Sequence, residues 1–240
     1  MVMGTGYNPR IVTENLVFCV DAANGRSYPK TGTTWTDLKG GNDGTLTNMT
    51  PANNYSSDNG GVFTFDGTDE YINVGNNSDL QITGEITVSA WIKGLAQINQ
   101  GIAGKYGYST GQRGYLLGTS DGSPYNKCVF WYQETAGAFN NGDGVYSTSV
   151  VLDGNWHFVV GTFEPSVAGK IYLDGELDAA DTYDVPAAIA NNTHVFEIGT
   201  YNTELARCFA GSIAGVSVYN RALTGDEVRQ NYEATVGRFT

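Results

Sequence analysis

Charged residues are scarce in this chain, and positive charges are the scarcer sign. Only 16% of the 240 residues are charged, and 13 Lys and Arg against 25 Asp and Glu leave a formal net charge of −12. Proteins that bind nucleic acids gain much of their affinity by neutralising phosphates, which so acidic a chain cannot do. An anionic membrane surface is an equally poor partner. The charge is compatible with divalent cations, neutral sugars and high solubility.

Long apolar runs are also missing. No stretch approaches the ~20 apolar residues of a membrane span. The first ten residues, MVMGTGYNPR, lack the apolar core of a signal peptide. We therefore expect one of two situations. Either the protein is exported by a non-classical route, or the chain is complete as it is synthesised.

Cysteine is rare, with an odd count of three. Cys19, Cys128 and Cys208 lie too far apart in the sequence for a zinc knuckle. We expect buried thiols that pack as small hydrophobic groups. The alternative is a disulfide between Cys19 and Cys208, which requires the first and last strands to be neighbours.

Glycine and tyrosine are abundant, at 32 and 15 residues, and the hydrophobic content of 40% is enough for a core. Apolar and polar residues alternate over many short segments, most cleanly over Ile86–Lys93. Roughly a dozen short strands with frequent turns predict an all-β sandwich or barrel. The expected strands are 16–21, 62–65, 71–74, 86–93, 102–106, 114–117, 127–133, 145–151, 156–163, 170–173, 176–178, 194–199 and 207–219.

Three local features stand out between these strands. Residues 22–61 form a connection that is too long for a simple loop between two strands, and we expect Tyr28 and Trp35 to anchor it. Asp174 and Gly175 predict a hairpin with a type I′ turn. The segment TGDE at 224–227 is a capping box, flanked by Leu223 and Val228 as a hydrophobic staple, and it predicts a structural helix that ends near Ala234.

Taken together, these segments resemble the concanavalin A-like lectin/glucanase superfamily, in its laminin-G-like branch. The resemblance includes Leu16–Asn24 and WTDLKGGNDGTL at 35–46. Its later blocks are VFTFDGTDEYINV (62–74), ITVSAWIK (86–93), DGNWHFVVGTF (153–163), KIYLDGE (170–176) and FAGSIAGVSVYNRALTGDEV (209–228).

The resemblance implies a jelly-roll sandwich of two antiparallel sheets with adjacent terminal strands and one short C-terminal helix. We expect residues 1–10 to form a tail and 11–240 a single domain. The N-terminal half and the ending from Asn220 to Tyr232 are similar to those of tailed-phage and environmental viral structural proteins. That similarity implies a virion appendage, with the protein on the virion surface.

Members of the superfamily mostly bind glycans or proteins, and some are glycosidases or lyases, so the fold alone does not decide. Its glucanases carry a Glu-x-Asp-x-Glu pattern that aims carboxyls into a cleft. The nearest match here is ELDAA at 176–180, which lacks the third carboxyl and follows directly on a turn. His157 and His194 are the only histidines, and neither lies in a catalytic motif. We expect no catalytic activity.

Aromatic residues suited to stack on sugars are densest over Lys127–Glu134. Alternation places Trp131 and Tyr132 on opposite faces of that strand, so one of them looks out of the core. The alternative is that both are core residues, as we expect for Trp91 and Trp156. We expect residues of the two preceding strands, with Tyr108 between them, to share the exposed face. The predicted ligand-binding residues are Lys105, Tyr106, Arg113, Tyr115, Trp131, Tyr132 and Gln133.

The resembling families often carry a structural calcium at the rim of the sandwich. Asp66 and Asp69 form one acidic cluster here, and Asp21 and Asn24 belong to a looser one. Many members have Asp where Ala214 stands, and its absence weakens the inference. The competing interpretation is that these residues only form turns.

The first functional hypothesis is therefore a non-catalytic carbohydrate-binding module, with a glycan or polysaccharide as its partner. The second is an assembly module that contacts further copies of itself or other virion proteins. The third is a lyase or hydrolase of polysaccharides. Neither the sugar nor the oligomeric state follows from the sequence.

Overall fold

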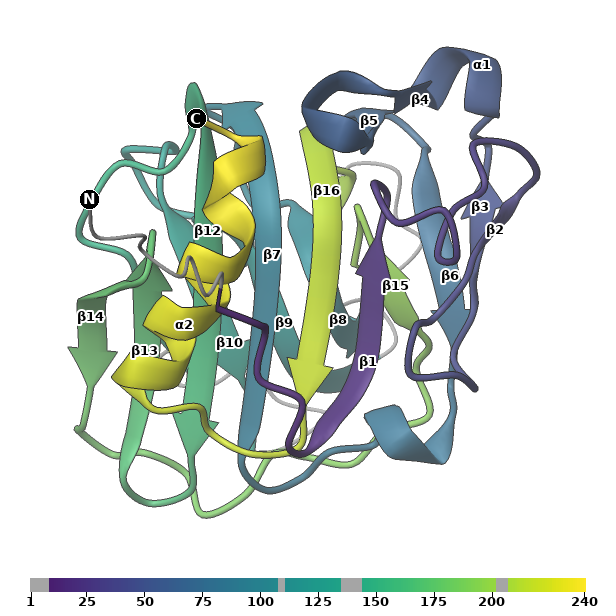
Figure 1. Ribbon diagram of the computed structural model, residues 1–240. Coiled ribbons are helices and arrows are strands. Elements are labelled where there is room, and N and C mark those ends of the chain that lie inside the picture. Colours follow the sequence, from purple (N-terminus) through teal and green to yellow (C-terminus); the bar gives the residue numbers. More distant parts are fainter. Residues whose placement is uncertain (1–8, 108–110, 135–143, 202–206) are drawn as a thin grey trace, which may run out of the picture.

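The computed structural model describes residues 9–107, 111–134, 144–201 and 207–240, and in these ranges two antiparallel sheets pack face to face (Figure 1). Sheet A has the order β14-β13-β12-β7-β16-β5-β4, with β1 beside β16. Its strands are β1 (Leu16–Asp21), β4 (Tyr55–Ser56), β5 (Val62–Asp66), β7 (Ile86–Leu95), β12 (Asp153–Glu164), β13 (Ala168–Leu173), β14 (Glu176–Asp181) and β16 (Ala210–Tyr219).

Sheet B lies behind it with the order β11-β10-β9-β8-β15-β6-β3-β2 (Figure 1). Its strands are β2 (Thr34–Trp35), β3 (Gly44–Thr47), β6 (Tyr71–Gly75), β8 (Gly101–Gly107), β9 (Gln112–Thr119), β10 (Cys128–Tyr132), β11 (Gly144–Tyr146) and β15 (Phe196–Ile198). The predicted two-sheet sandwich is confirmed. The expected strand at 145–151 is shorter than predicted, because Ser147–Leu152 turns back toward β12.

The alternation of β7 shows how the strand sequences build this core. Ile86, Val88, Ala90 and Ile92 are buried between the sheets, while Trp91 lies on the opposite face. This is the arrangement that a period of two predicts. The prediction that the first and last strands are adjacent is also confirmed. β1 pairs with β16 from Leu16↔Tyr219 to Asp21↔Gly215.

The long connection after β1 is ordered by aromatic packing, as expected. Besides β2, β3 and β4 it contains the single-turn helix α1 (Pro51–Asn54) and the 3-10 turn η1 (Asp58–Gly60). Tyr28 and Trp35 are fully buried against Phe63 of β5, with ring centroids 4.7 and 4.8 Å away. Another 3-10 turn, η2 (Ser78–Leu80), joins β6 to β7.

The C-terminal helix α2 (Gly225–Thr235) covers the outer face of sheet A and is followed by the 3-10 turn η4 (Val236–Arg238) (Figure 1). Its capping box is formed by Thr224 and Glu227 as predicted. Trp91 packs beneath it, with Phe239 stacked at 4.1 Å and Tyr232 at 5.8 Å. Trp91 and Trp156 are thus packing residues, in a second apolar layer between sheet and helix. Within the described residues no helix is long and apolar enough to span a membrane.

The alternative of a Cys19–Cys208 disulfide is wrong. All three cysteines are buried and free, and the expectation of buried thiols is confirmed. Cys19 contacts Ser217 of the neighbouring β16, whereas Cys208 contacts Thr200 beyond the opposite end of that strand. The terminal strands are neighbours, but Cys208 precedes β16 and lies well away from the position opposite Cys19, so the two sulfurs do not meet.

Candidate functional site

The predicted ligand residues do not share one exposed face, which corrects the expectation from the sequence. On β10, Phe130 and Tyr132 point between the sheets, and Tyr115 of β9 pairs with Tyr132 and points the same way. Trp131 points to the outer face of sheet B, where it joins Tyr106. Strand alternation separates neighbouring residues in this way whenever both faces are packed.

Glycines on the facing sheet explain why the β10 aromatics turn inward. A Cβ on Gly161 of β12 would lie 2.3 Å from the ring of Phe130. A Cβ on Gly169 of β13 would lie 2.2 Å from the Tyr132 hydroxyl. These two glycines leave the space that the inward rings fill, so Tyr115 and Tyr132 are core residues and not sugar platforms.

The outward residues are also buried, so their expected exposure was wrong. Tyr106, Trp131 and Tyr201 form an outer aromatic cluster with ring centroids 5.6 to 6.2 Å apart. Trp131 is 4% exposed and Tyr106 is fully covered. The rings of this cluster therefore pack against one another and are not open to a ligand. The expected contribution of Tyr108 falls outside the described residues.

Lys105 is a buried cross-link and not a surface ligand. Its Nζ donates to Asn76 Oδ1 at 2.6 Å, to Asn192 O and Oδ1 at 2.8 and 3.1 Å, and to the carbonyl of His194. The side chain thus joins the turn after β6 to the segment before β15. Burial lowers the pKa of Lys105 to about 8. Arg113 and Gln133 are buried as well, at 9% and 1% exposed.

Exposed apolar side chains instead lie along the connections at one end of the sandwich. We call this set of residues the loop-end patch. Leu95, on the same face of β7 as Trp91, lies at its sheet A side, and Tyr146, beside Val129, lies at its sheet B side. Its connections are held together by backbone hydrogen bonds, from Gln97 N to Tyr125 O and from Val151 N to Asn126 O, each 2.9 Å. At the same end of the sandwich, Leu95 of β7 pairs with Asp153 of β12. The patch comprises Leu95, Ile98, Tyr125, Tyr146 and Val150, which are 69%, 46%, 42%, 40% and 45% exposed.

Tyr146 connects the loop-end patch to the outer aromatic cluster. Its hydroxyl accepts a long hydrogen bond from Trp131 Nε1 at 3.4 Å and donates to Asp121 Oδ1 at 2.9 Å. Nearby, the Tyr201 hydroxyl donates to Asn99 Oδ1 at 2.6 Å. Burial raises the pKa of Tyr146, so the phenol stays neutral near neutral pH. The buried rings therefore fix an exposed tyrosine among polar loop residues.

This patch was missed in the sequence because its aromatic residues lie at strand ends and in loops. Tyr125 sits in the turn-rich segment DGSPYN at 121–126, and Tyr146 is the last residue of the three-residue strand GVY. A lone aromatic in a loop of Gly, Pro, Asn and Asp lacks a packing partner in its own segment. That signal was present and pointed to exposure.

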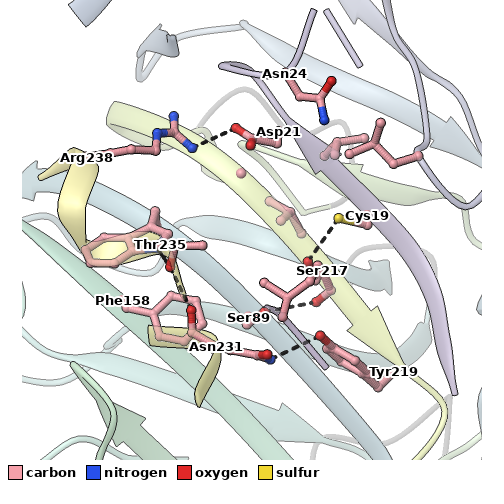
Figure 2. A pocket seen from close by; sticks show the side chains of 16 residues that line it. Cys19, Asp21, Asn24, Ser89, Phe158, Ser217, Tyr219, Asn231, Thr235 and Arg238 are labelled. Carbon is pink, nitrogen blue, oxygen red and sulfur yellow. Dashed lines mark hydrogen bonds and ion pairs between the residues drawn. The ribbon is translucent and has the colours of Figure 1, made fainter. Parts of the chain in front are cut away.

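The two predicted acidic clusters lie apart on the molecule, as two separate segments of the sequence. Asp21 and Asp66 lie beside Gly215 and Ala210 of β16, five residues apart, or about 16 Å along the strand. Asp21 is held by Arg238 Nη1 at 2.7 Å, as Figure 2 shows, and Asn24 caps a local turn. Asp66 accepts a hydrogen bond from Thr68 N within its own turn, and Asp69 accepts one from Asn48 Nδ2, just after β3. In the part of the chain that the structure describes, no group of three acidic, His or Cys side chains forms a metal site.

The nearest match to a catalytic motif is engaged in structural contacts. Glu176 pairs with Arg229 of α2 at 2.9 Å. Asp178 accepts hydrogen bonds from the amides of Thr148 and Ser149 at 2.6 and 3.1 Å. Burial opposes ionisation of Asp178, but these bonds prevail and lower its pKa, which is the opposite of what a general acid needs.

The histidines are likewise tied to neighbouring carboxylates. His157 bonds to Asp174 at 2.8 Å and to Asp153 at 3.3 Å, and the hydrogen bond with Asp174 raises its pKa. His194 lies 3.2 Å from the fully buried Glu197. Asp174 and Gly175, both with positive φ, form the predicted type I′ hairpin turn. His157 thereby fastens the end of β12 to this hairpin.

Comparison with known protein families decides what this sandwich is. A family model of the concanavalin A-like lectin/glucanases superfamily matches residues 66–229. The chain belongs to this superfamily. The resemblance seen in the ordered sequence blocks is confirmed. A search of curated proteins found no match.

Solved structures of other members of this fold superimpose on the chain at low identity. Domain 4 of AbnA, an extracellular arabinanase from Geobacillus stearothermophilus in complex with arabinotriose, has a TM-score of 0.65 at 16% identity, with 91% of this chain and 98% of that one covered. The binding domain of Paraclostridial Mosquitocidal Protein 1 has a TM-score of 0.65 at 13% identity, with 91% and 52% covered.

A larger enzyme contains a similar sandwich. Trypanosoma rangeli sialidase, in complex with 2,3-difluorosialic acid, has a TM-score of 0.64 at 17% identity, with 96% of this chain and 35% of that chain covered. The chain thus spans about a third of the sialidase and about half of the toxin binding domain. At these identities the likeness concerns the fold.

Proposed function

We propose that this concanavalin A-like sandwich is a non-catalytic carbohydrate-binding module whose ligand contacts the loop-end patch. The observation that carries the proposal is the exposed pair Tyr125 and Tyr146, with Tyr146 fixed by Trp131 below it and Asp121 beside it. Sugars bind where an aromatic face meets their C–H surface and planar polar groups meet their hydroxyls.

The surroundings of the patch favour a neutral sugar. Asp121 supplies a carboxylate, and the side-chain amides of Gln97 and Asn99 lie in the adjoining connection. The chain carries a net charge of −12, which disfavours an anionic saccharide. The arabinanase domain 4 that shares the fold was solved with arabinotriose, an uncharged oligosaccharide, and this supports the same ligand class here.

The non-catalytic part of the proposal is supported by the carboxylates themselves. Glu176 and Asp178 lie on β14, at the edge of sheet A, and each is occupied by a structural partner. A retaining glycosidase needs two carboxyls ~5–5.5 Å apart with one held protonated. A hydrogen-bonded carboxylate whose pKa is lowered is unsuited to the acid role.

Assembly is the second candidate, because three members of the patch are aliphatic. Leu95, Ile98 and Val150 expose 69%, 46% and 45% of their surface. Exposed apolar groups gathered in one place mark a protein contact as readily as a sugar site. In that case the patch would be buried against a second copy or another structural protein.

A glycan array with and without calcium tests the proposal directly. We expect binding to one class of neutral saccharide, and loss of it in the variant Tyr125→Ala. Tyr183→Ala, which removes a tyrosine 86% exposed outside the patch, is the matched control. Absence of binding across the array would overturn the proposal.

Two further measurements separate the alternatives. Light scattering that gives a stable oligomer, dissociated by Leu95→Asp, would favour assembly. New reducing ends or unsaturated products after incubation with laminarin or alginate would show catalysis and contradict the non-catalytic assignment. Placement in a virion appendage and a rim calcium remain parts of the proposal that derive from the resemblance alone, and the calcium arm of the array tests the second.

A further inference from the structure

A pocket of about 180 Å³ lies on the outer face of sheet A, and none of the residues that line it belongs to the loop-end patch (Figure 2). Its floor is formed by β1, β7 and β16, and its roof by α2 and η4. Residues from both ends of the chain therefore share one cavity, from Ile11 to Arg238.

The walls of this pocket are mainly apolar. Trp91 and Phe158 line it, together with Leu38 from the long connection after β1. The Trp91 indole is held in place by Phe239 stacked on it and by a 2.8 Å hydrogen bond from Nε1 to Thr235 Oγ1. Rigid rings on the wall preserve the volume, since they have few rotamers with which to collapse.

Hydroxyl groups with weak partners line the floor. The Ser217 hydroxyl contacts Cys19 Sγ at 3.5 Å, and Ser89 Oγ donates to Ser217 O at 3.4 Å. The Ser89 distance is long for a hydrogen bond between two oxygens, and sulfur is a weak acceptor, so either hydroxyl gains by turning to a stronger partner. Burial raises the pKa of the Cys19 thiol to about 11, so the sulfur stays protonated and unreactive.

The two charged groups at the mouth of the pocket, Arg238 and Asp21, form an ion pair with each other. Arg238 donates to Asp21 Oδ1 at 2.7 Å (Figure 2). It also donates to Asn59 O at 2.9 Å and to Gly61 O at 3.0 Å. Its charge is balanced by Asp21, and its position is fixed by three acceptors. An anionic ligand would have to break these contacts, and a cationic one would compete with Arg238 itself.

We propose that this pocket binds a neutral, mainly apolar small molecule that carries a hydroxyl group. A cavity of about 150 Å³ accommodates benzene, so the volume here suits a single ring with a short substituent. The apolar body lies against Trp91 and Phe158, and the hydroxyl exchanges hydrogen bonds with Ser217 and Ser89. The ligand is held without covalent chemistry.

The position of the pocket gives binding a structural consequence. Ile11 and β1 form part of the wall from the N-terminal side, and Asn231, Thr235 and Arg238 form it from the C-terminal side. A ligand that fits only when both are docked stabilises the native state, and the stabilisation grows with the logarithm of the ligand concentration above its Kd. Occupancy would therefore fasten α2 to sheet A.

Titration of the full chain followed by ¹H–¹⁵N NMR tests the proposal, with benzyl alcohol, phenylacetate and toluene as probes. For benzyl alcohol we expect saturable shifts that include the Trp91 indole N–H and the Ser217 amide. Binding of phenylacetate should be at least tenfold weaker. Failure of benzyl alcohol to saturate, or shifts confined to other residues, would overturn the proposal.

Variants of one residue complete the design. Ser217→Leu fills the pocket and should weaken the binding of benzyl alcohol at least tenfold. Ser212→Leu, on the same strand but outside the pocket, should leave that binding unchanged. If Ser217→Leu does not fold, the smaller Ser217→Ala serves instead. It should retain toluene binding and lose the preference for benzyl alcohol, and an unchanged preference would contradict the role of the hydroxyl. None of these residues belongs to the loop-end patch, so failure here leaves the glycan proposal standing.

Discussion

At the scale of single residues, Lys105 is the most consequential buried polar group. Four oxygens from Asn76, Asn192 and His194 surround its ammonium. Asn76 Oδ1 also accepts a hydrogen bond from Gln81 Nε2, and Asn192 Oδ1 accepts one from His194 N. We expect Lys105→Met to lower the free energy of unfolding by about 3 kcal/mol, because all four oxygens would lose the charged donor that they share. Urea unfolding at pH 7 measures this.

The control for this substitution is Lys93→Met on β7. Lys93 is exposed, so its replacement should change the free energy of unfolding by no more than about 0.5 kcal/mol. A loss below about 1 kcal/mol for Lys105→Met would show that the cross-link is dispensable.

Gly169 provides the second residue-scale prediction. Any side chain at this position would meet Tyr132 at 2.2 Å, and both residues are packed between the sheets. We expect Gly169→Ala to destabilise the protein by about 2 kcal/mol or more through overpacking. Gly25→Ala, where a Cβ meets nothing within 4 Å, should be nearly neutral in the same thermal unfolding experiment. Equal stability of the two variants would refute the inward placement of Tyr132.

The residue scale is also where the sequence was least informative. Alternation separated Trp131 from Tyr132, but the run from Cys128 to Tyr132 is apolar at every position and so does not say which face is the core. Gly161 and Gly169, which decide it, lie some thirty to forty residues later in the chain and act only through the packing of sheet A on sheet B. Likewise the oxygens that bury Lys105 come from two distant turns.

At the scale of elements, α2 is fastened at its N-terminus by Arg221 and Glu227. The guanidinium donates to both carboxylate oxygens at 2.7 Å, and this contact lowers the pKa of Glu227 to about 2. Since the folded-state pKa lies below the ordinary value, the stabilisation is complete above about pH 4.5 and is lost as the pH falls toward 2. Partial exposure of both groups reduces it to about 1–2 kcal/mol.

Stability measured by urea unfolding between pH 6 and pH 2.5 checks this prediction. The wild type should lose about 1–2 kcal/mol more over this range than Glu227→Gln, in which the titrating group is absent. Glu233→Gln, an exposed position later in α2, should follow the wild type. Parallel curves for wild type and Glu227→Gln would contradict the proposed anchoring.

Elements were predictable where a local rule governs them. The capping box at Thr224, the type I′ turn at Asp174 and the alternation of β7 each depend on neighbours within a few residues, and each is confirmed. The brief strands β2 and β4 were not predicted, because two residues carry no period. They exist only where Trp35 and Tyr55 pack on Phe63.

At the scale of the whole molecule, the ordered blocks predicted the sandwich and the meeting of the terminal strands. The proposed binding surface was not predicted, because it is assembled from the ends of β7, β9, β10 and β11 and has no contiguous motif. The ion pair between Asp21 and Arg238, near the end of the chain, was not predicted either, because it appears only in three dimensions. Calcium binding stays a prediction.

Isothermal titration with the saccharide selected on the array tests the central claim, a glycan site on the loop-end patch, most directly. We predict that Tyr125→Ala and Tyr146→Ala each weaken binding at least tenfold, about 1.4 kcal/mol, through loss of aromatic stacking. Tyr183→Ala should bind as the wild type does. Unchanged affinity in both patch variants, with their fold intact by circular dichroism, would contradict the assignment of the glycan site to this surface.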